Sequence, residues 1–249
     1  MKAGDFPRYR LPPGLIAGLS FNAWFGVRRS FREDALQCIA RLKPSSRVIG
    51  EENVPDREPC VVTVNHYSRP GFGAWWIALA IAATVPVEMH WVITSELTYL
   101  GWLGSPASRW ALARLARTYG FTAMPPMPPR PQDLETRARS VRAVLQYARC
   151  HLDFLLGLAP EGADQTDGRL SMPAPGVGRF ALLLAGLGST FVPVGAYEAD
   201  GAFCLRFGPA YRLSVPSDLT AHEKDRVAAE TMMRKIAALL PESLRGEFA

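Results

Sequence analysis

The sequence predicts an α/β fold with a mixed, mostly parallel sheet flanked by helices. Short apolar runs rich in β-branched residues alternate with longer segments of helical periodicity, which is the pattern of strands joined by helical crossovers. The 249 residues are 48% hydrophobic, enough to bury one sizeable core. We therefore expect an N-terminal helical segment, residues 1–46, followed by a single globular domain, residues 47–249.

Predicted strands and helices follow one another in a definite order. Strands are expected in the apolar runs at 47–50, 60–64, 90–94, 119–124, 154–159, 191–196 and 203–207. Helices are expected at 31–42, 72–83, 105–118, 133–149 and 176–187, with a last helix starting at Thr220. Asp133 is the expected cap of the fourth of these helices. Residues 196–203 are expected to form a hairpin turn near one edge of the sheet.

An apolar, aromatic segment, residues 11–27, precedes the domain. Pro12, Pro13 and Gly18 interrupt it and argue against a membrane-spanning helix, which needs a longer unbroken apolar run. Arginines flank the segment on both sides, and its aromatic side chains suit a helix lying at a bilayer interface. A helix packed on the domain explains the same pattern, so both interpretations stay open.

Two polar loops follow apolar strand segments. Residues 65–71 leave the run at 60–64, and residues 160–164 leave the run at 154–159. Because ligands in α/β sheets bind at the carboxyl ends of parallel strands, we expect His66 and Glu161 to face one pocket. A histidine with a pKa near neutrality can remove a proton from a hydroxyl group there.

These loops resemble the motifs of the glycerolipid acyltransferase family, typified by 1-acylglycerol-3-phosphate acyltransferase. The family pattern is Asn-His, four residues and Asp, then a Pro-Glu-Gly-Thr-Arg block, then a Val-Pro-Val strand. The matching residues are Asn65, His66, Pro160, Glu161, Gly162 and 192–194, and the resemblance covers roughly residues 47–212. Two positions depart from it: the family's Asp falls on Gly71, and its Thr-Arg pair falls on Ala163 and Asp164.

The resemblance implies an enzyme that moves a fatty acyl group from acyl-CoA or acyl-carrier protein to the hydroxyl or amine of a lysophospholipid or related lipid. His66 would be the general base, and the thioester would be a co-substrate, with no cofactor and no metal. The implied substrate-binding residues are Asn65, Tyr67, Ser68, Arg69, Pro160, Glu161 and Gly162, with Arg130 as the candidate for an acceptor phosphate. Such a protein would be cytoplasmic and peripheral on the inner face of the membrane.

The missing motif aspartate leaves three accounts open. In the first, Asp164 or Glu161 takes over the role of orienting the His66 ring. In the second, the chain is an inactive protein of the same fold that binds lipid or acyl carrier. In the third, the acceptor lacks a phosphate, because Asp164 in place of the family's Arg would repel one. In triads, losing the orienting carboxylate costs about 10⁴ in rate, so the choice decides whether the chain is active.

Composition and charge favour some classes of binding partner over others. The net charge of +5 and pI near 9.2 suit an anionic lipid surface, whereas the chain has no lysine-rich run typical of nucleic-acid binding. The four cysteines show no metal-ligand spacing and indicate buried thiols in a reducing compartment. No hydrolase elbow, P-loop or dinucleotide fingerprint occurs. The oligomeric state stays undetermined.

Overall fold

The computed structural model describes residues 6–56, 58–97, 101–162 and 168–249, and for residues 101–103 it describes the backbone alone. Within these ranges a seven-stranded sheet has the order β1-β7-β6-β2-β5-β3-β4. The strands are β1 (Arg47–Ile49), β2 (Cys60–Val64), β3 (His90–Thr94), β4 (Thr122–Met124), β5 (Leu155–Leu158), β6 (Thr190–Ala199) and β7 (Ala202–Phe207). All neighbours pair in parallel except β6 and β7, so the predicted mixed, mostly parallel sheet is confirmed.

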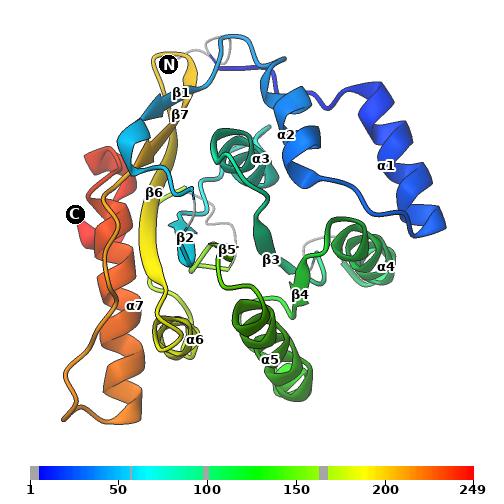
Figure 1. Ribbon diagram of the computed structural model, residues 1–249. Coiled ribbons are helices and arrows are strands. Elements are labelled where there is room, and N and C mark those ends of the chain that lie inside the picture. Colours follow the sequence, from blue (N-terminus) through cyan, green and yellow to red (C-terminus); the bar gives the residue numbers. More distant parts are fainter. Residues whose placement is uncertain (1–5, 57, 98–100, 163–167) are drawn as a thin grey trace.

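Helices cover both faces of the sheet. They are α1 (Pro13–Phe25), α2 (Phe31–Ile39), α3 (Trp75–Thr84), α4 (Gly101–Tyr119), α5 (Leu134–Cys150), α6 (Val177–Ala185) and α7 (Ala221–Ala237). Helices α2 and α3 lie on one face, and α5, α6 and α7 lie on the other (Figure 1). Helix α1 packs on α4 beyond the β4 edge. Short 3₁₀ turns are Glu51–Asn53, Pro131–Asp133, Glu242–Leu244 and Gly246–Phe248.

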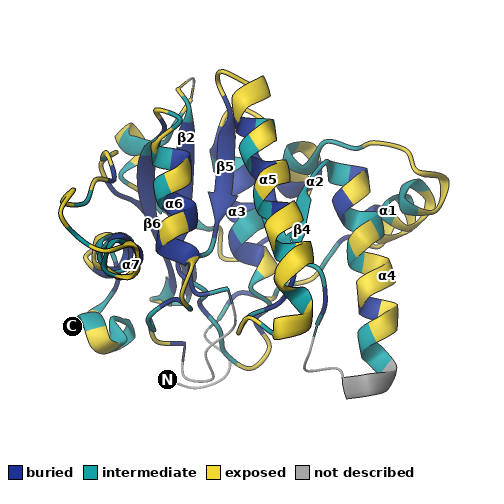
Figure 2. Cartoon of the chain, turned by 90° about the horizontal axis from the view of Figure 1, so that it is seen from below, coloured by how far each residue is buried: buried dark blue, intermediate teal, exposed yellow. Residues whose placement is uncertain are grey.

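Each face of the sheet buries its own apolar layer. Side chains of β2, such as Val62 and Val64, pack with the buried face of α3, which includes Ile81. On the other face, Val61 and Leu156 pack against α6 and α7. Burying one such side chain contributes about 1.5–3 kcal/mol. Figure 2 shows the buried strands enclosed by helices whose outer faces are exposed.

Several element boundaries differ from the sequence prediction. The β6–β7 hairpin turns at Asp200 and Gly201 alone, because both adopt the positive φ that a two-residue type I′ turn requires (49° and 71°). Strand β6 is therefore longer than predicted and carries its pairing up to the turn. Helix α4 begins at Gly101, four residues earlier than predicted, and contains Pro106 inside the helix, where proline has no N–H for a helical hydrogen bond.

The expected cap of α5 is also different. Asp133 directly precedes the helix, but its carboxylate accepts a hydrogen bond from Arg130 Nε at 2.6 Å instead of capping the helix amides. The last helix starts at Thr220 as predicted, and Thr220 and Glu223 bond reciprocally there in a capping box at the start of α7.

The N-terminal segment leaves large apolar side chains at the surface. Phe21, Trp24 and Phe25 of α1 are 60 to 66% exposed, while Leu15 of the same helix is buried. Among the residues that the structure describes, no helix is long and apolar enough to cross a membrane. Three of the four free cysteines are buried, and Cys150 is exposed.

Candidate functional site

The candidate site lies where parallel strands end at one edge of the sheet. Strands β2 and β5 pair in parallel, so the loop that follows Val64 and the loop that follows Leu158 leave the sheet side by side. His66 is half-buried in the first loop. Pro160 and Glu161 are buried in the second. The structure thus brings together the two segments that the sequence predicted to face one pocket.

The Glu161 carboxylate bridges the two loops. Its Oε2 accepts a hydrogen bond from the backbone N–H of His66 at 2.7 Å, and its Oε1 accepts one from the backbone N–H of Ser171 at 3.0 Å. Glu161 is 5% exposed, so these bonds form in a poorly solvated environment. Glu161 therefore fixes the backbone at His66.

Gly162 allows the turn that presents Glu161. Its N–H donates to Ala159 O at 3.1 Å, and its φ of 69° is unfavourable for other residues. A Cβ atom at Gly162 would lie 2.6 Å from Cγ of Met127. The proline-rich loop that carries Met127 thus packs directly on the Pro160–Gly162 turn.

Asn65 anchors the start of the histidine loop. Its side-chain amide donates to Ala196 O at 2.9 Å, and its Oδ1 accepts from Ala196 N–H at 2.7 Å. Asn65 is 2% exposed and so acts as a rigid link between the end of β2 and β6. The loop's Ser68 approaches the second loop, since a Cβ at Gly168 would lie 2.6 Å from Ser68 O.

Tyr67 and Arg69 both bind Glu198 of β6. The Tyr67 hydroxyl donates to Glu198 Oε2 at 3.1 Å, and the Arg69 guanidinium donates to both carboxylate oxygens, at 2.5 and 2.7 Å. Burial, reinforced by the Glu198 charge, raises the pKa of Tyr67 to about 12. Sequence reasoning did not find Glu198, because a lone glutamate at a strand end carries no signal of its partner.

Gly71 occupies the place of the family's motif aspartate and forms a tight turn. Phe72 N–H donates to Arg69 O at 3.1 Å, and Gly71 has φ of 82°. The Pro70–Gly71 sequence with positive φ at the glycine is what a type II turn requires. This turn also explains why α3 begins at Trp75 rather than at Phe72.

Arg130 lies between two carboxylates. Its Nη2 is 3.2 Å from Oε2 of Glu96, which lies two residues beyond β3, and its Nε is 2.6 Å from Asp133 Oδ2. Glu96 is 9% exposed and also accepts from the Ser105 hydroxyl. An acceptor phosphate at Arg130 would compete with both acids. Asp164, the predicted orienting residue, lies outside the described residues.

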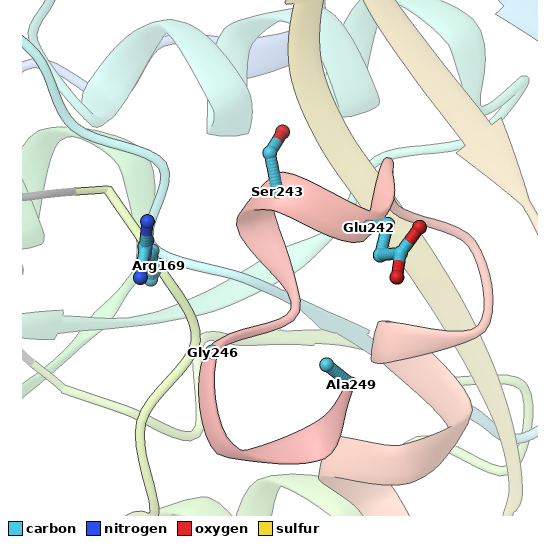
Figure 3. Close-up of a pocket in the computed structure, with 5 residues that line it drawn as sticks. All are labelled: Arg169, Glu242, Ser243, Gly246 and Ala249. Carbon is cyan, nitrogen blue, oxygen red and sulfur yellow. The ribbon is translucent and has the colours of Figure 1, made fainter.

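The C-terminal tail contacts residues 170–172, the segment that follows the second loop. Leu170 N–H donates to Leu244 O at 3.0 Å, and Met172 N–H donates to Glu247 Oε1 at 2.6 Å. Figure 3 shows the tail beside Arg169, around a pocket of about 400 Å³ that Arg169, Glu242, Ser243, Gly246 and Ala249 line. His66 is not among the residues that line this pocket. Within the described ranges, no three His, Cys, Asp or Glu side chains are grouped as metal ligands.

Comparison with known proteins identifies similar chains. A family model described as Acyltransferase matches residues 45–197. The crystal structure of the 1-acyl-sn-glycerophosphate (LPA) acyltransferase PlsC from Thermotoga maritima is similar with a TM-score of 0.50 and 15% identity, over 90% of this chain and 80% of that chain. At this identity the likeness shows the fold alone. No curated protein sequence matches significantly. The predicted family resemblance and fold are both confirmed.

Proposed function

Because the chain belongs to the acyltransferase family, we propose that it moves a fatty acyl group from acyl-CoA or acyl-carrier protein to a hydroxyl or amine of a lysophospholipid or related lipid. The observation that carries the proposal is the hydrogen bond from His66 N–H to Glu161, which joins the two motif loops at the carboxyl edge of the sheet. Family membership supports acyl transfer in general. The donor, the acceptor and the base are the proposed part.

His66 acts as the general base in this reaction. An imidazole nitrogen takes the proton from the acceptor hydroxyl as its oxygen attacks the thioester carbonyl carbon. The tetrahedral intermediate then collapses, the carbon–sulfur bond breaks, and the leaving thiolate receives the proton from the imidazolium. General base catalysis of this kind contributes about 10² to 10⁴ in rate.

Asp164 is the proposed orienting carboxylate for the His66 ring. The Gly71 turn holds no carboxylate, and the two Glu161 oxygens already accept from the backbone amides of His66 and Ser171. In the sequence Asp164 follows the Pro160–Gly162 turn by two residues, and we therefore propose it as the source of the acid. Asp164→Asn is expected to lower turnover by orders of magnitude while lipid still binds.

An acceptor whose binding does not depend on an arginine–phosphate pair fits the site best. Arg69 and Arg130, the two arginines predicted to bind substrate, each form ion pairs with carboxylates. Replacing those partners with a phosphate would leave buried Glu198 and nearly buried Glu96 without a cation. A neutral hydroxyl or an amine avoids this cost.

A bilayer surface is the proposed location of the reaction. Phe21, Trp24 and Phe25 of α1 project apolar surface into solvent, and Arg28 follows them. Exposed aromatic residues beside arginines are typical of helices that lie in an anionic interface. We place the protein on the cytoplasmic face of the membrane as a peripheral protein.

The test is acyl transfer from radiolabelled acyl-CoA, and separately from acyl-carrier protein, to a panel of lysolipids and lipid amines. The wild type is expected to form a labelled product, and His66→Ala to lose at least about 10² of the rate. His222→Ala is the matched control, because His222 is an exposed histidine on α7. An equal rate in the wild type and His66→Ala contradicts the role of His66.

The competing function is an inactive lipid- or acyl-carrier-binding protein of the same fold. The observation that favours it is the Gly71 turn at the position of the motif aspartate. Binding of lysolipid without transfer from either donor, in the wild type as in His66→Ala, would establish this function.

A further inference from the structure

Glu198 is a buried carboxylate with several donors around it. It lies near the end of β6, its side chain is 0% exposed, and it accepts from the Arg69 guanidinium at 2.5 and 2.7 Å. The hydroxyls of Tyr67 and Tyr9 donate to it at 3.1 and 2.7 Å. Two of these donors, Tyr67 and Arg69, belong to the loop that carries His66.

Phe6 and Tyr9, which precede α1, cover the other side of the ion pair between Arg69 and Glu198. The Phe6 ring lies 4.3 Å from the Arg69 guanidinium carbon, a cation–π distance. Tyr9 packs edge-on against Phe72 with ring centroids 4.9 Å apart. Arg69 Nη1 also donates to Pro70 O at 2.7 Å, so all three guanidinium nitrogens of Arg69 have acceptors. Cover of this kind keeps water from the ion pair and strengthens it.

Contacts outside the Glu198 cluster hold the histidine loop at His66, whose backbone N–H donates to Glu161, and at its two ends. Asn65 fixes its first residue to β6, and the Gly71 turn ends it with no side chain at the position of the motif aspartate. Between these points the side chains of Tyr67 and Arg69 both turn to Glu198. Because Tyr67 adjoins His66, the direction of the Tyr67 side chain constrains the backbone of the histidine.

We propose that Glu198 is a positioning residue that holds the His66 loop in its working conformation through Arg69 and Tyr67. The loop has Gly71 in place of the motif aspartate. The ion pair with Glu198 of β6 therefore supplies part of the positioning that an acid in the loop would provide. A buried ion pair adds little net stability, but a bidentate arginine–carboxylate contact fixes geometry. Misplacing a catalytic group by about 1 Å can cost up to about 100-fold in rate.

The test compares Glu198→Gln with the double variant Arg69→Met/Glu198→Gln. Glutamine keeps the shape of the side chain but turns amide protons toward the Arg69 donors, so the loop is expected to loosen. We expect Glu198→Gln to lower kcat at least about tenfold with little change in KM, and to speed hydrogen exchange at residues 65–72 but not in α7. The double variant removes both charges and is expected to regain thermal stability while kcat stays low.

Asp200→Asn is the matched control. Asp200 lies two residues beyond Glu198, is 82% exposed on its side chain, and forms an ion pair with Arg47 at 3.4 Å. Asparagine tolerates the positive φ found there. The inference is overturned if Glu198→Gln exchanges and turns over like Asp200→Asn, or if the double variant regains the wild-type kcat, because the ion pair would then only balance charge.

The turnover readout rests on the proposed function, whereas the exchange readout does not. If the wild type transfers no acyl group from any donor, the proposed function fails. Exchange at residues 65–72 then decides the inference alone: faster exchange in Glu198→Gln and in the double variant, but not in Asp200→Asn, supports it. Unchanged exchange in Glu198→Gln contradicts it.

Discussion

Glu161 Oε2 accepts a hydrogen bond from the backbone N–H of His66 at 2.7 Å, although the two residues are 95 positions apart in the chain. The contact exists because β2 and β5 are parallel neighbours whose carboxyl ends meet at one edge of the sheet. Glu161 binds the backbone of the histidine and thereby fixes the conformation of its loop. The same carboxylate holds Ser171, which ties both motif loops to one buried acid.

Replacing Glu161 with Gln should therefore damage both stability and activity. The single glutamine oxygen can accept a hydrogen bond from only one of the two backbone N–H groups, those of His66 and Ser171. The side-chain nitrogen of the glutamine would then face the other N–H donor in a buried position. Leaving one buried donor without an acceptor costs about 1–3 kcal/mol. The melting temperature should therefore decrease clearly, and the rate of acyl transfer should fall. Glu135→Gln is the control, because the Glu135 side chain is 84% exposed on α5. Equal melting temperatures for the two variants would contradict the role assigned to Glu161.

Restoring the motif carboxylate by Gly71→Asp should not create a working site. The φ of 82° at Gly71 costs a residue with a side chain roughly 1–2 kcal/mol, so an aspartate would strain the turn. We expect lower thermal stability and no gain in turnover. Gly14→Ala, at a helical glycine with open space for a Cβ, should leave stability equal or higher. A variant Gly71→Asp with wild-type stability and raised turnover would show that the turn is adaptable.

Folding stability should fall between pH 7 and pH 5 because of His90. Burial, with a smaller contribution from the charge of His151, lowers the pKa of His90 from 6.5 to about 4. The unfolded chain then binds a proton in this range that the folded chain does not, so stability decreases as the pH falls. The expected loss is about 2 kcal/mol at pH 5.

Urea unfolding of the wild type and His90→Gln at the two pH values measures this effect. The variant removes the titrating ring, which stacks on Tyr147 and bonds Thr122 Oγ1 at 2.9 Å, so it should be less stable at pH 7 but less sensitive to pH. His222→Gln should keep the wild-type pH dependence, because His222 is exposed. The same pH dependence in all three proteins would rule out His90 as its source.

Binding to anionic vesicles should depend on the exposed aromatic residues of α1. The triple variant Phe21→Ser/Trp24→Ser/Phe25→Ser removes apolar surface without disturbing buried Leu15. We expect the wild type to sediment with the vesicles, less so at high salt, and the variant to sediment much less. Leu134→Ser/Leu152→Ser, which removes exposed apolar side chains elsewhere, is the control. Equal sedimentation of both variants would exclude α1 as the membrane-binding element.

Deleting residues 1–29 would test vesicle binding less cleanly than the triple variant. Tyr9 bonds Glu198, and Arg29 forms an ion pair with Asp34, whose side chain is 3% exposed. A deletion through residue 29 would remove these contacts together with α1. Loss of vesicle binding could then result from damage to the domain, which the triple variant avoids.

The sequence by itself determined the order of elements and the location of the two motif loops. The β-branched run at 60–64 becomes the buried strand β2, and the Thr220 and Glu223 spacing becomes a capping box, because both signals act between residues close in the chain. The same local logic placed His66 and Glu161 at strand ends. Family membership could likewise be predicted from motif order alone.

Only the tertiary structure decided which side chains are already engaged at this edge. Arg69 and Arg130 were predicted to bind substrate, but the fold gives them Glu198, Glu96 and Asp133 as partners. A charged residue has many potential partners in a sequence, and its contacts depend on strand order and register, which bring distant segments within hydrogen-bonding distance. The pairing of β6 with β2 places Glu198 beside the histidine loop, and no pattern within either segment encodes that meeting.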